Sequence, residues 1–208
     1  MIAALSRAIA VSLFTGLATA CFWTGDGDDL ASGFESELYV DDLESPVAMA
    51  SDPNGRVLVT EKNSGDVRLI DEQGRLKAEP VIHFEAASAG EWGLLGIALH
   101  PDFQANRLAY VYYMAPSVEG RSQPVVARFQ IDGDVGRDPS IVVSDLPRTS
   151  ITGASPEVDL FSNIHVGGNL HFGRDELLYV SIGDFGVFQQ RSADPGEAIG
   201  KLLRFTAE

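Results

Sequence analysis

His165 and Asp184 are the two residues of this chain whose types and spacing best suit acid–base chemistry. Both flank a stretch that alternates like a β-hairpin, with expected arms at Asn169–Phe172 and Leu177–Ile182 and a turn at Gly173–Glu176. A carboxylate beside an imidazole holds one ring nitrogen as a donor and leaves the other free as a base. The pattern therefore predicts a general base at the open end of a hairpin.

The pairing register decides whether these two side chains meet. Facing positions of an antiparallel pair have a constant index sum, so if Phe172 faces Leu177, then His165 faces Asp184. Facing Cα atoms in such a ladder lie about 4.5–5.5 Å apart. A slip by one residue would break the pairing. Whatever the register, the alternative to chemistry is that both residues are ordinary turn residues or a solvated pair.

Glycines surround the expected pair, at Gly167, Gly168, Gly183 and Gly186. They let a flat ligand approach the backbone closely, and they serve equally well in bulges and tight turns. The sequence leaves both interpretations open.

The composition is that of an acidic chain of ordinary globular type. Its 208 residues include 30 Asp and Glu against 15 Lys and Arg, which is a formal net charge of -15. Repulsion between like charges argues against nucleic acid and anionic lipid surfaces as partners. Glycine and proline are spread along the chain, as in proteins built of many short strands.

The N-terminus has the features of an export signal. Residues 1–20 hold one positive region followed by the apolar, small-residue run Ala8–Ala20, which is too short to span a bilayer as a mature helix. Cys21 follows at once and resembles the lipidated cysteine of bacterial lipoproteins; an ordinary secretory signal with an incidental cysteine is the alternative. We expect a periplasmic or outer-membrane protein that contacts the membrane only through the lipid anchor. Cys21 is the single cysteine, so no internal disulfide and no cysteine-based metal site is expected.

A Gly/Asp-rich tether is expected at 21–35, and one pattern then repeats through 36–208. Each unit joins an apolar strand, a turn with Asp, Pro or Gly and further β-rich strands, at about 35–90, 91–150 and 151–208. Besides the hairpin, the expected strands are Glu37–Val40, Val47–Ala50, Arg56–Thr60, Val67–Ile70, Leu94–Leu99, Leu108–Tyr113, Val125–Ile131 and Lys201–Phe205. Units of this kind predict an all-β fold, a β-propeller of which about three blades are present. A β-sandwich is the alternative.

Three blades do not close a propeller, which typically has four to eight. We therefore expect this chain to be part of a larger ring. It would be a truncated product, a fragment, or one partner that pairs with a second half-propeller or with another copy of itself.

The remaining histidines are weaker candidates for a catalytic or metal-binding role. His100 lies in a His-Pro-Asp turn and is expected to be structural, and His171 lies in mid-strand. His83 is expected in a loop, with no partner that the sequence identifies. No two of them share a ligand spacing on one element, so no metal site is predicted.

Two long motifs carry a family resemblance. The first is Gly93–Phe103 followed by Tyr110–Tyr113, and the second runs from His165–Gly168 through Gly183-Asp184 to Gly200–Arg204. In order and content they resemble the PQQ-dependent glucose/sorbosone (aldose sugar) dehydrogenases, over nearly all of the chain after about residue 36. The resemblance implies a six-bladed propeller with pyrroloquinoline quinone (PQQ) on its axis.

The resemblance also implies roles for particular residues. His165 would take the proton of the sugar's anomeric hydroxyl while hydride passes to PQQ, and Asp184 would orient His165. Glu91 and Gln189 would contact the cofactor, and Gln190 the substrate. The family's calcium ligands and its Arg/Lys clamp on the quinone carboxylates lie in later blades, beyond this chain.

Departures from the family pattern keep other functions open. Val166 stands where Asn often follows the histidine, and Glu91 stands in place of Gln, where it would repel the quinone carboxylates unless protonated or turned away. A non-catalytic propeller that binds carbohydrate or protein is therefore the alternative to a dehydrogenase. A propeller hydrolase for lactones or esters is a third option, for which the chain shows no metal nest.

Overall fold

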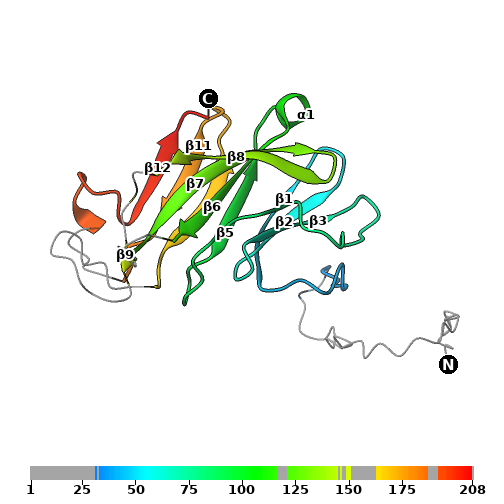
Figure 1. Ribbon diagram of the computed structural model, residues 1–208, viewed down its shortest axis with the longest axis horizontal. Coiled ribbons are helices and arrows are strands. Elements are labelled where there is room, and N and C mark those ends of the chain that lie inside the picture. Colours follow the sequence, from blue (N-terminus) through cyan, green and yellow to red (C-terminus); the bar gives the residue numbers. More distant parts are fainter. Residues whose placement is uncertain are drawn as a thin grey trace, which may run out of the picture. The chain divides into compact units, whose positions relative to one another are not determined.

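The named strands form three antiparallel sheets that follow one another along the chain (Figure 1). The first sheet contains β1 (Pro46–Ser51), β2 (Val57–Glu61), β3 (Asp66–Ile70) and β4 (Ile82–His83). The second contains β5 (Leu94–Leu99), β6 (Leu108–Ala115), β7 (Arg121–Asp132) and β8 (Val135–Val143), with β9 (Thr149–Ser150) paired to β7. The third contains β10 (Gly167–Phe172), β11 (Leu178–Ile182) and β12 (Lys201–Phe205). A short helix, α1 (Phe103–Asn106), lies between β5 and β6.

The structure describes residues 31, 33–116, 121–144, 146, 149–150, 163–186 and 192–207. The chain divides into two compact units, Met1–Leu38 and Tyr39–Glu208, and all named strands lie in the second. In the first unit the backbone N–H of Phe34 donates to the carbonyl oxygen of Ala31 at 3.0 Å. Within the described residues there is no helix of the length and apolarity that crossing a bilayer requires.

The prediction of an all-β chain in three repeating units is confirmed, because each expected unit contains one sheet. The expected strand at Glu37–Val40 is wrong: the backbone there is irregular, and Leu38 and Tyr39 are exposed. β4 and β8 were not expected. β4 is only two residues long, and β8 contains an Arg-Asp-Pro sequence that is typical of a turn. Proline is tolerated there because β8 is the last strand of its sheet.

Strand β6 of the second sheet is buried on both faces, which explains why the β6 sequence is apolar. Ala109, Val111 and Tyr113 belong to the core shared with the first sheet. The alternate residues Tyr110, Tyr112 and Met114 belong to the core shared with the third sheet. Successive side chains of a strand point to opposite faces, so a strand between two cores reads as a continuous apolar run.

The first strands of neighbouring sheets approach closely where glycine leaves room. A Cβ on Gly96 of β5 would collide with the carbonyl oxygen of Gly168 in β10, and a Cβ on Gly168 would meet the side chains of Leu95 and Tyr112. Gly168 also has a φ of 110°, which side chains other than glycine rarely adopt. These two glycines therefore set the spacing between the second and third sheets.

One bulge recurs near the start of the first strand of every sheet. The register shifts by one residue between Pro46 and Ala48 and between Leu94 and Gly96. It shifts again between Gly167 and Leu170 in β10. A bulge adds one unpaired residue and bends the strand, so each first strand changes direction at the same edge of its sheet.

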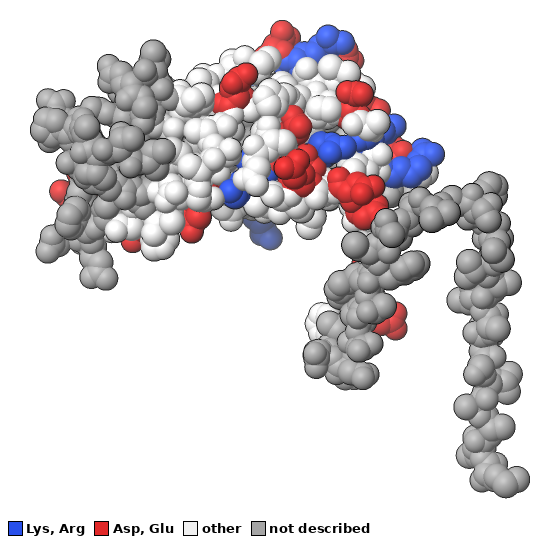
Figure 2. Space-filling model, turned by 60° about the horizontal axis from the view of Figure 1, so that its bottom comes forward, with Lys and Arg blue, Asp and Glu red and all other residues white. Residues whose placement is uncertain are grey.

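Two turns each begin at a buried aspartate that forms an ion pair with an arginine four residues later. Asp52 Oδ1 accepts the backbone N–H of Arg56 at 3.0 Å and its Oδ2 accepts Arg56 Nε at 2.7 Å; Asp71 and Arg75 repeat this arrangement at 3.0 and 2.9 Å. Burial raises the pKa of Asp52, but hydrogen bonds from Arg56 outweigh that effect and its pKa lies below the usual value. Figure 2 shows basic and acidic side chains interspersed on one face, without a continuous basic patch in that view.

Candidate functional site

The structure brings His165 and Asp184 together. His165 lies two residues before β10 and Asp184 lies two residues after β11, and His165 Nδ1 is 2.9 Å from Asp184 Oδ1. Gly167 faces Ile182 at this end of the hairpin. The expected meeting of the two side chains at the open end of the hairpin is therefore observed.

The register by which they were expected to meet is wrong over most of the hairpin. Phe172 faces Leu178 rather than Leu177, and Leu170 faces Val180. The bulge in β10 then absorbs one residue, so Gly167 faces Ile182 and the index sum returns to the predicted one. A regular ladder from the observed turn would have carried His165 out of step with Asp184.

The backbone around His165 is held in an unusual conformation by its neighbours. His165 has a φ of 53°, in the left-handed region, and its carbonyl oxygen accepts the backbone N–H of Phe185 at 3.1 Å. Gly183 passes so close that a Cβ there would collide with the same carbonyl. Tyr112 reaches from the second sheet and donates its buried hydroxyl to the carbonyl oxygen of Val166 at 2.7 Å. The loop is therefore held both by its own hairpin, through Phe185, and by the second sheet, through Tyr112.

Glu91 contributes a contact from the neighbouring sheet. Its carboxylate oxygen Oε2 accepts the backbone N–H of His165, and its own backbone N–H donates to the carbonyl oxygen of Asn163 at 2.7 Å. Gly90 precedes it with a φ of 59°, where a Cβ would collide with Asn163. Glu91 lies just before β5 as His165 lies just before β10, so both residues belong to the same edge.

Lys62, which follows β2, ties down the segment that carries Glu91. Its ammonium group donates to the carbonyl oxygens of Gly90 at 2.8 Å and Trp92 at 3.3 Å, and to Asn63 Oδ1 at 2.9 Å. The three donors of the ammonium group all have acceptors. Lys62 therefore stabilises the loop and has no hydrogen left for a ligand in this arrangement.

The electrostatics of the pair favour one tautomer of His165. The backbone N–H of Gly186, at 2.9 Å, and then the His165 ring hold the pKa of the Asp184 carboxyl below its usual value. An ionised carboxylate accepts hydrogen bonds only, so the ring nitrogen facing it, Nδ1, carries the proton. Nε2 is then left with a lone pair. His165 and Asp184 are 56% and 41% exposed, so the pair orients the ring rather than stabilising the fold appreciably.

The other expected site residues divide into two groups. Glu91, predicted as a cofactor contact, lies against the backbone of His165. Gln189, Gln190 and Cys21 lie outside the described residues. The reasoning from sequence missed Lys62, Tyr112 and Asn163 as members of this edge. Lys62 and Asn163 lie outside strands and Tyr112 lies within β6. No local pattern indicates them, because each acts through a contact to backbone in another part of the chain.

A second His–Asp pair lies in the first sheet. The expected loop at His83 is wrong, because His83 lies in β4. The sequence identified no partner for it, but its Nδ1 is 2.9 Å from Asp66 Oδ1, across the β3–β4 pairing. His100 has a structural role: its Nδ1 accepts the backbone N–H of Asp102 at 3.0 Å. Among the described residues, no three His, Cys, Asp or Glu side chains lie together as metal ligands.

Comparison with known proteins identifies a family and relatives that this chain resembles. The chain matches the family described as Glucose / Sorbosone dehydrogenase over residues 43–208. It is 26% identical over 165 residues to Quinoprotein glucose dehydrogenase B of Acinetobacter calcoaceticus, covering 75% of this chain and 32% of that protein. It is 28% identical over 152 residues to Hedgehog-interacting protein of Mus musculus, covering 68% of this chain and 21% of that protein.

A solved structure gives the same result for the fold. The PQQ-bound form of Aldose Sugar Dehydrogenase from Streptomyces coelicolor matches with a TM-score of 0.66 and 28% identity, covering 79% of this chain and 45% of that chain. The present chain thus spans less than half the length of each of these proteins. Its three sheets correspond to part of a six-bladed propeller, and the chain belongs to the Glucose / Sorbosone dehydrogenase family.

Proposed function

We propose that this chain supplies the proton-accepting part of the active site of a PQQ-dependent aldose dehydrogenase. The observation that carries the proposal is the 2.9 Å contact between His165 Nδ1 and Asp184 Oδ1, at the edge where the second and third sheets meet. His165 is the base, Asp184 orients it, and Glu91 holds the His165 backbone. The substrate is an aldose that reacts at its anomeric carbon.

The chemistry follows from the tautomer. Asp184 holds the proton on Nδ1, so Nε2 accepts the proton of the sugar's anomeric hydroxyl. The positive charge that forms on the ring is stabilised by the carboxylate beside it. Because the pKa of the Asp184 carboxyl lies below that of an ordinary aspartate, the carboxylate that orients the ring stays ionised in mildly acidic solution.

The described residues fit this proton transfer but do not fit tight binding of PQQ. When bound, PQQ supplies the acceptor for the hydride. Its three carboxylates need a cationic clamp, but Lys62 is already bonded to three oxygens and Glu91 is an acid. The Glu91 carboxylate is turned to the backbone N–H of His165, which partly offsets its charge. We therefore assign the clamp to blades beyond this chain, with Gln189 as a further contact to the cofactor and Gln190 as a contact to the substrate.

Closing the ring requires more blades than this chain contains. We propose a second half-propeller or a second copy of the chain as the partner. We also propose export to the periplasm or outer membrane, with lipid attached to Cys21 as the only membrane contact.

The test is a titration of the purified chain with PQQ and calcium, followed by quinone absorbance and by aldose-dependent dye reduction. We expect saturable binding and turnover only when the missing blades are supplied, and loss of turnover in His165→Ala. The matched control is His83→Ala, which removes the other paired histidine. Turnover by His165→Ala at the wild-type rate would overturn the assignment of the base.

A second candidate is a non-catalytic propeller that binds carbohydrate or protein. It is favoured by the relative named Hedgehog-interacting protein and by Glu91, an acid where the dehydrogenases usually have Gln. Two results together would support this candidate over the dehydrogenase. The wild-type chain, joined to its missing blades, would not reduce the dye, and His165→Ala would bind sugar or protein as the wild type does.

A further inference from the structure

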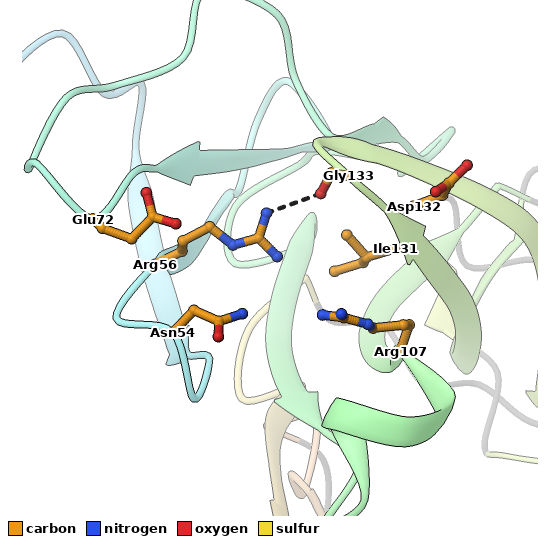
Figure 3. A pocket seen from close by; sticks show the side chains of 7 residues that line it. All are labelled: Asn54, Arg56, Glu72, Arg107, Ile131, Asp132 and Gly133. Atoms are coloured by element: carbon orange, nitrogen blue, oxygen red, sulfur yellow. Dashed lines mark hydrogen bonds between the residues drawn. The ribbon is translucent and has the colours of Figure 1, made fainter.

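A hollow of about 290 Å³ lies between turns of the first sheet and turns of the second (Figure 3). Asn54 and Arg56 line it from the β1–β2 turn, Arg107 from the end of α1, and Gly133 from the β7–β8 turn. These residues adjoin the end of β1 and the ends of β5 and β7, whereas Glu91 adjoins the start of β5. Six residues of extended strand, roughly 20 Å, therefore separate the hollow from the edge that carries His165.

Arg56 is fixed in the wall of this hollow. Its Nε donates to Asp52 Oδ2 at 2.7 Å, and its Nη1 donates to the carbonyl oxygen of Gly133 at 2.9 Å and lies 3.3 Å from Asp134 Oδ1. Its side chain is only 12% exposed. The guanidinium is thus held in place before any ligand arrives, so little conformational entropy is lost when a ligand binds.

Arg107 is positioned by its backbone but has donors to spare. It ends α1 in a left-handed conformation, its N–H donates to the carbonyl oxygen of Phe103 at 2.9 Å, and its own carbonyl accepts the N–H of Ile131 at 2.9 Å. Its guanidinium carbon lies 5.9 Å from the centre of the Phe103 ring. Within the part of the chain that the structure describes, this guanidinium makes no hydrogen bond and no ion pair.

Three acids lie at this hollow, and none of them forms an ion pair with Arg107 in the described residues. Glu72 lines it on the side of Arg56, across from Arg107 (Figure 3). Asp132 is bound to Arg137 at 3.1 Å, and Asp134 is shared between Arg56 and Lys77, at 3.3 and 3.2 Å. In Figure 3 the Asp132 carboxylate points away from the hollow, whereas Arg56, Arg107 and the Asn54 amide point into it. Nitrogen donors from two separate segments, the β1–β2 turn and the end of α1, therefore converge on one space.

We propose that this hollow is an oxyanion-binding site, in which Arg107 and Arg56 bind the phosphate or carboxylate group of a small metabolite. Guanidinium groups bind planar carboxylates and phosphates through paired N–H donors, and Asn54 adds an amide donor. The site is independent of the proposed function, because none of its residues belongs to the edge that carries His165. Its ligand is a small anion, since the net charge of -15 repels larger polyanions.

The test is an NMR titration of the whole chain with inorganic phosphate and, separately, with succinate, each against sodium chloride of the same ionic strength. We expect saturable shifts in the backbone signals of Arg107 and Gly133 with at least one of the two anions. The anion that saturates at the lower concentration identifies the phosphate or the carboxylate source. Arg107→Gln should weaken binding at least about tenfold, since a charged hydrogen-bond partner is lost.

Three variants make the result decisive. Arg107→Lys keeps the charge without the planar fork and should bind more weakly than wild type but better than Arg107→Gln. Arg204→Gln removes an exposed arginine from β12 and should bind as wild type does, and so should His165→Ala. The proposal is overturned if neither anion produces more than the sodium chloride response, or if Arg107→Gln and Arg204→Gln bind equally well.

Discussion

Among the residues that the structure describes, two His–Asp pairs have the same local geometry and different surroundings. Nδ1 of His165 and of His83 each lies 2.9 Å from an aspartate Oδ1, and the two imidazole side chains are 56% and 53% exposed. A glycine precedes the aspartate in each pair, and neither glycine leaves room for a Cβ. The distance within the pair therefore does not distinguish a candidate base from a hydrogen-bonded His–Asp pair at the surface.

The neighbours of the two pairs do distinguish them. His165 lies before the first strand of its sheet, in a left-handed backbone held by Glu91 from the next sheet. His83 lies in β4, the last strand of its sheet, and pairs with Asp66 across a regular ladder. Contacts between sheets converge on the first strands, so that edge can position several groups around one reacting atom. A pair on an outer strand has no such support.

The largest expected difference is in activity. In a preparation in which the missing blades are supplied, His165→Ala should lower aldose-dependent dye reduction by about 10²–10⁴-fold, as loss of a general base does. His83→Ala should leave it within about twofold. Equal losses in the two variants would remove the functional distinction between the pairs.

The next largest difference is expected in the stability of variants at Gly183 and Gly65, the glycines that precede the two aspartates. Gly183→Ala should lower the free energy of unfolding by about 3 kcal/mol, because the new methyl group collides with the carbonyl oxygen of His165. Gly65→Ala should be destabilising to a similar extent, because it collides with Phe84 at a φ of 79°. Only Gly183→Ala should also separate His165 from Asp184.

Thermal unfolding measures the first effect and dye reduction the second. Gly55→Ala is the control, since it has a φ of 89° but open space around it, and it should cost only about 1 kcal/mol. If all three variants were equally stable, steric collision would not explain why glycine occupies positions 65 and 183.

A smaller effect is expected from Glu91, the contact that His83 lacks. Glu91→Ala removes the acceptor of the His165 N–H and should lower dye reduction about tenfold by letting the loop move. Glu91→Gln keeps an oxygen acceptor and should retain most of the activity. A loss in Glu91→Gln as large as in Glu91→Ala would instead indicate that the charge itself contacts the ligand.

The smallest effect is the acid dependence of the pair. Because the pKa of Asp184 is lowered from 3.8, its stabilising contribution is present above that value and is lost as the pH falls through the lower folded value. A ¹³C titration of the Asp184 carboxyl should give a midpoint below 3.8. His165→Ala should return it only part of the way, because Gly186 still donates to the carboxylate. A midpoint at or above 3.8 in the wild type would contradict the inference that hydrogen bonds lower the pKa of Asp184.

Much of the fold could be predicted from local patterns. Apolar runs separated by turn residues predicted the positions of six strands to within a few residues: β1, β2, β3, β5, β6 and β12. Each of these strands is marked by its own apolar residues and by the turn residues at its ends. β4 and β8 could not be predicted, since they are strands only through pairing with β3 and β7. Glu37–Val40 has the composition of a strand but lacks a paired neighbour in the described residues.

By itself, the sequence determined that the chain is an acidic all-β protein of repeating units with His165 and Asp184 at one hairpin. These properties follow from alternation and from which residue types can exchange protons. Only the tertiary structure decided that a bulge restores the register and that Glu91 holds His165. It also decided that His83 has a partner and that Arg56 and Arg107 face one hollow. The reason is that each depends on contacts between segments far apart in the chain, which local patterns do not encode.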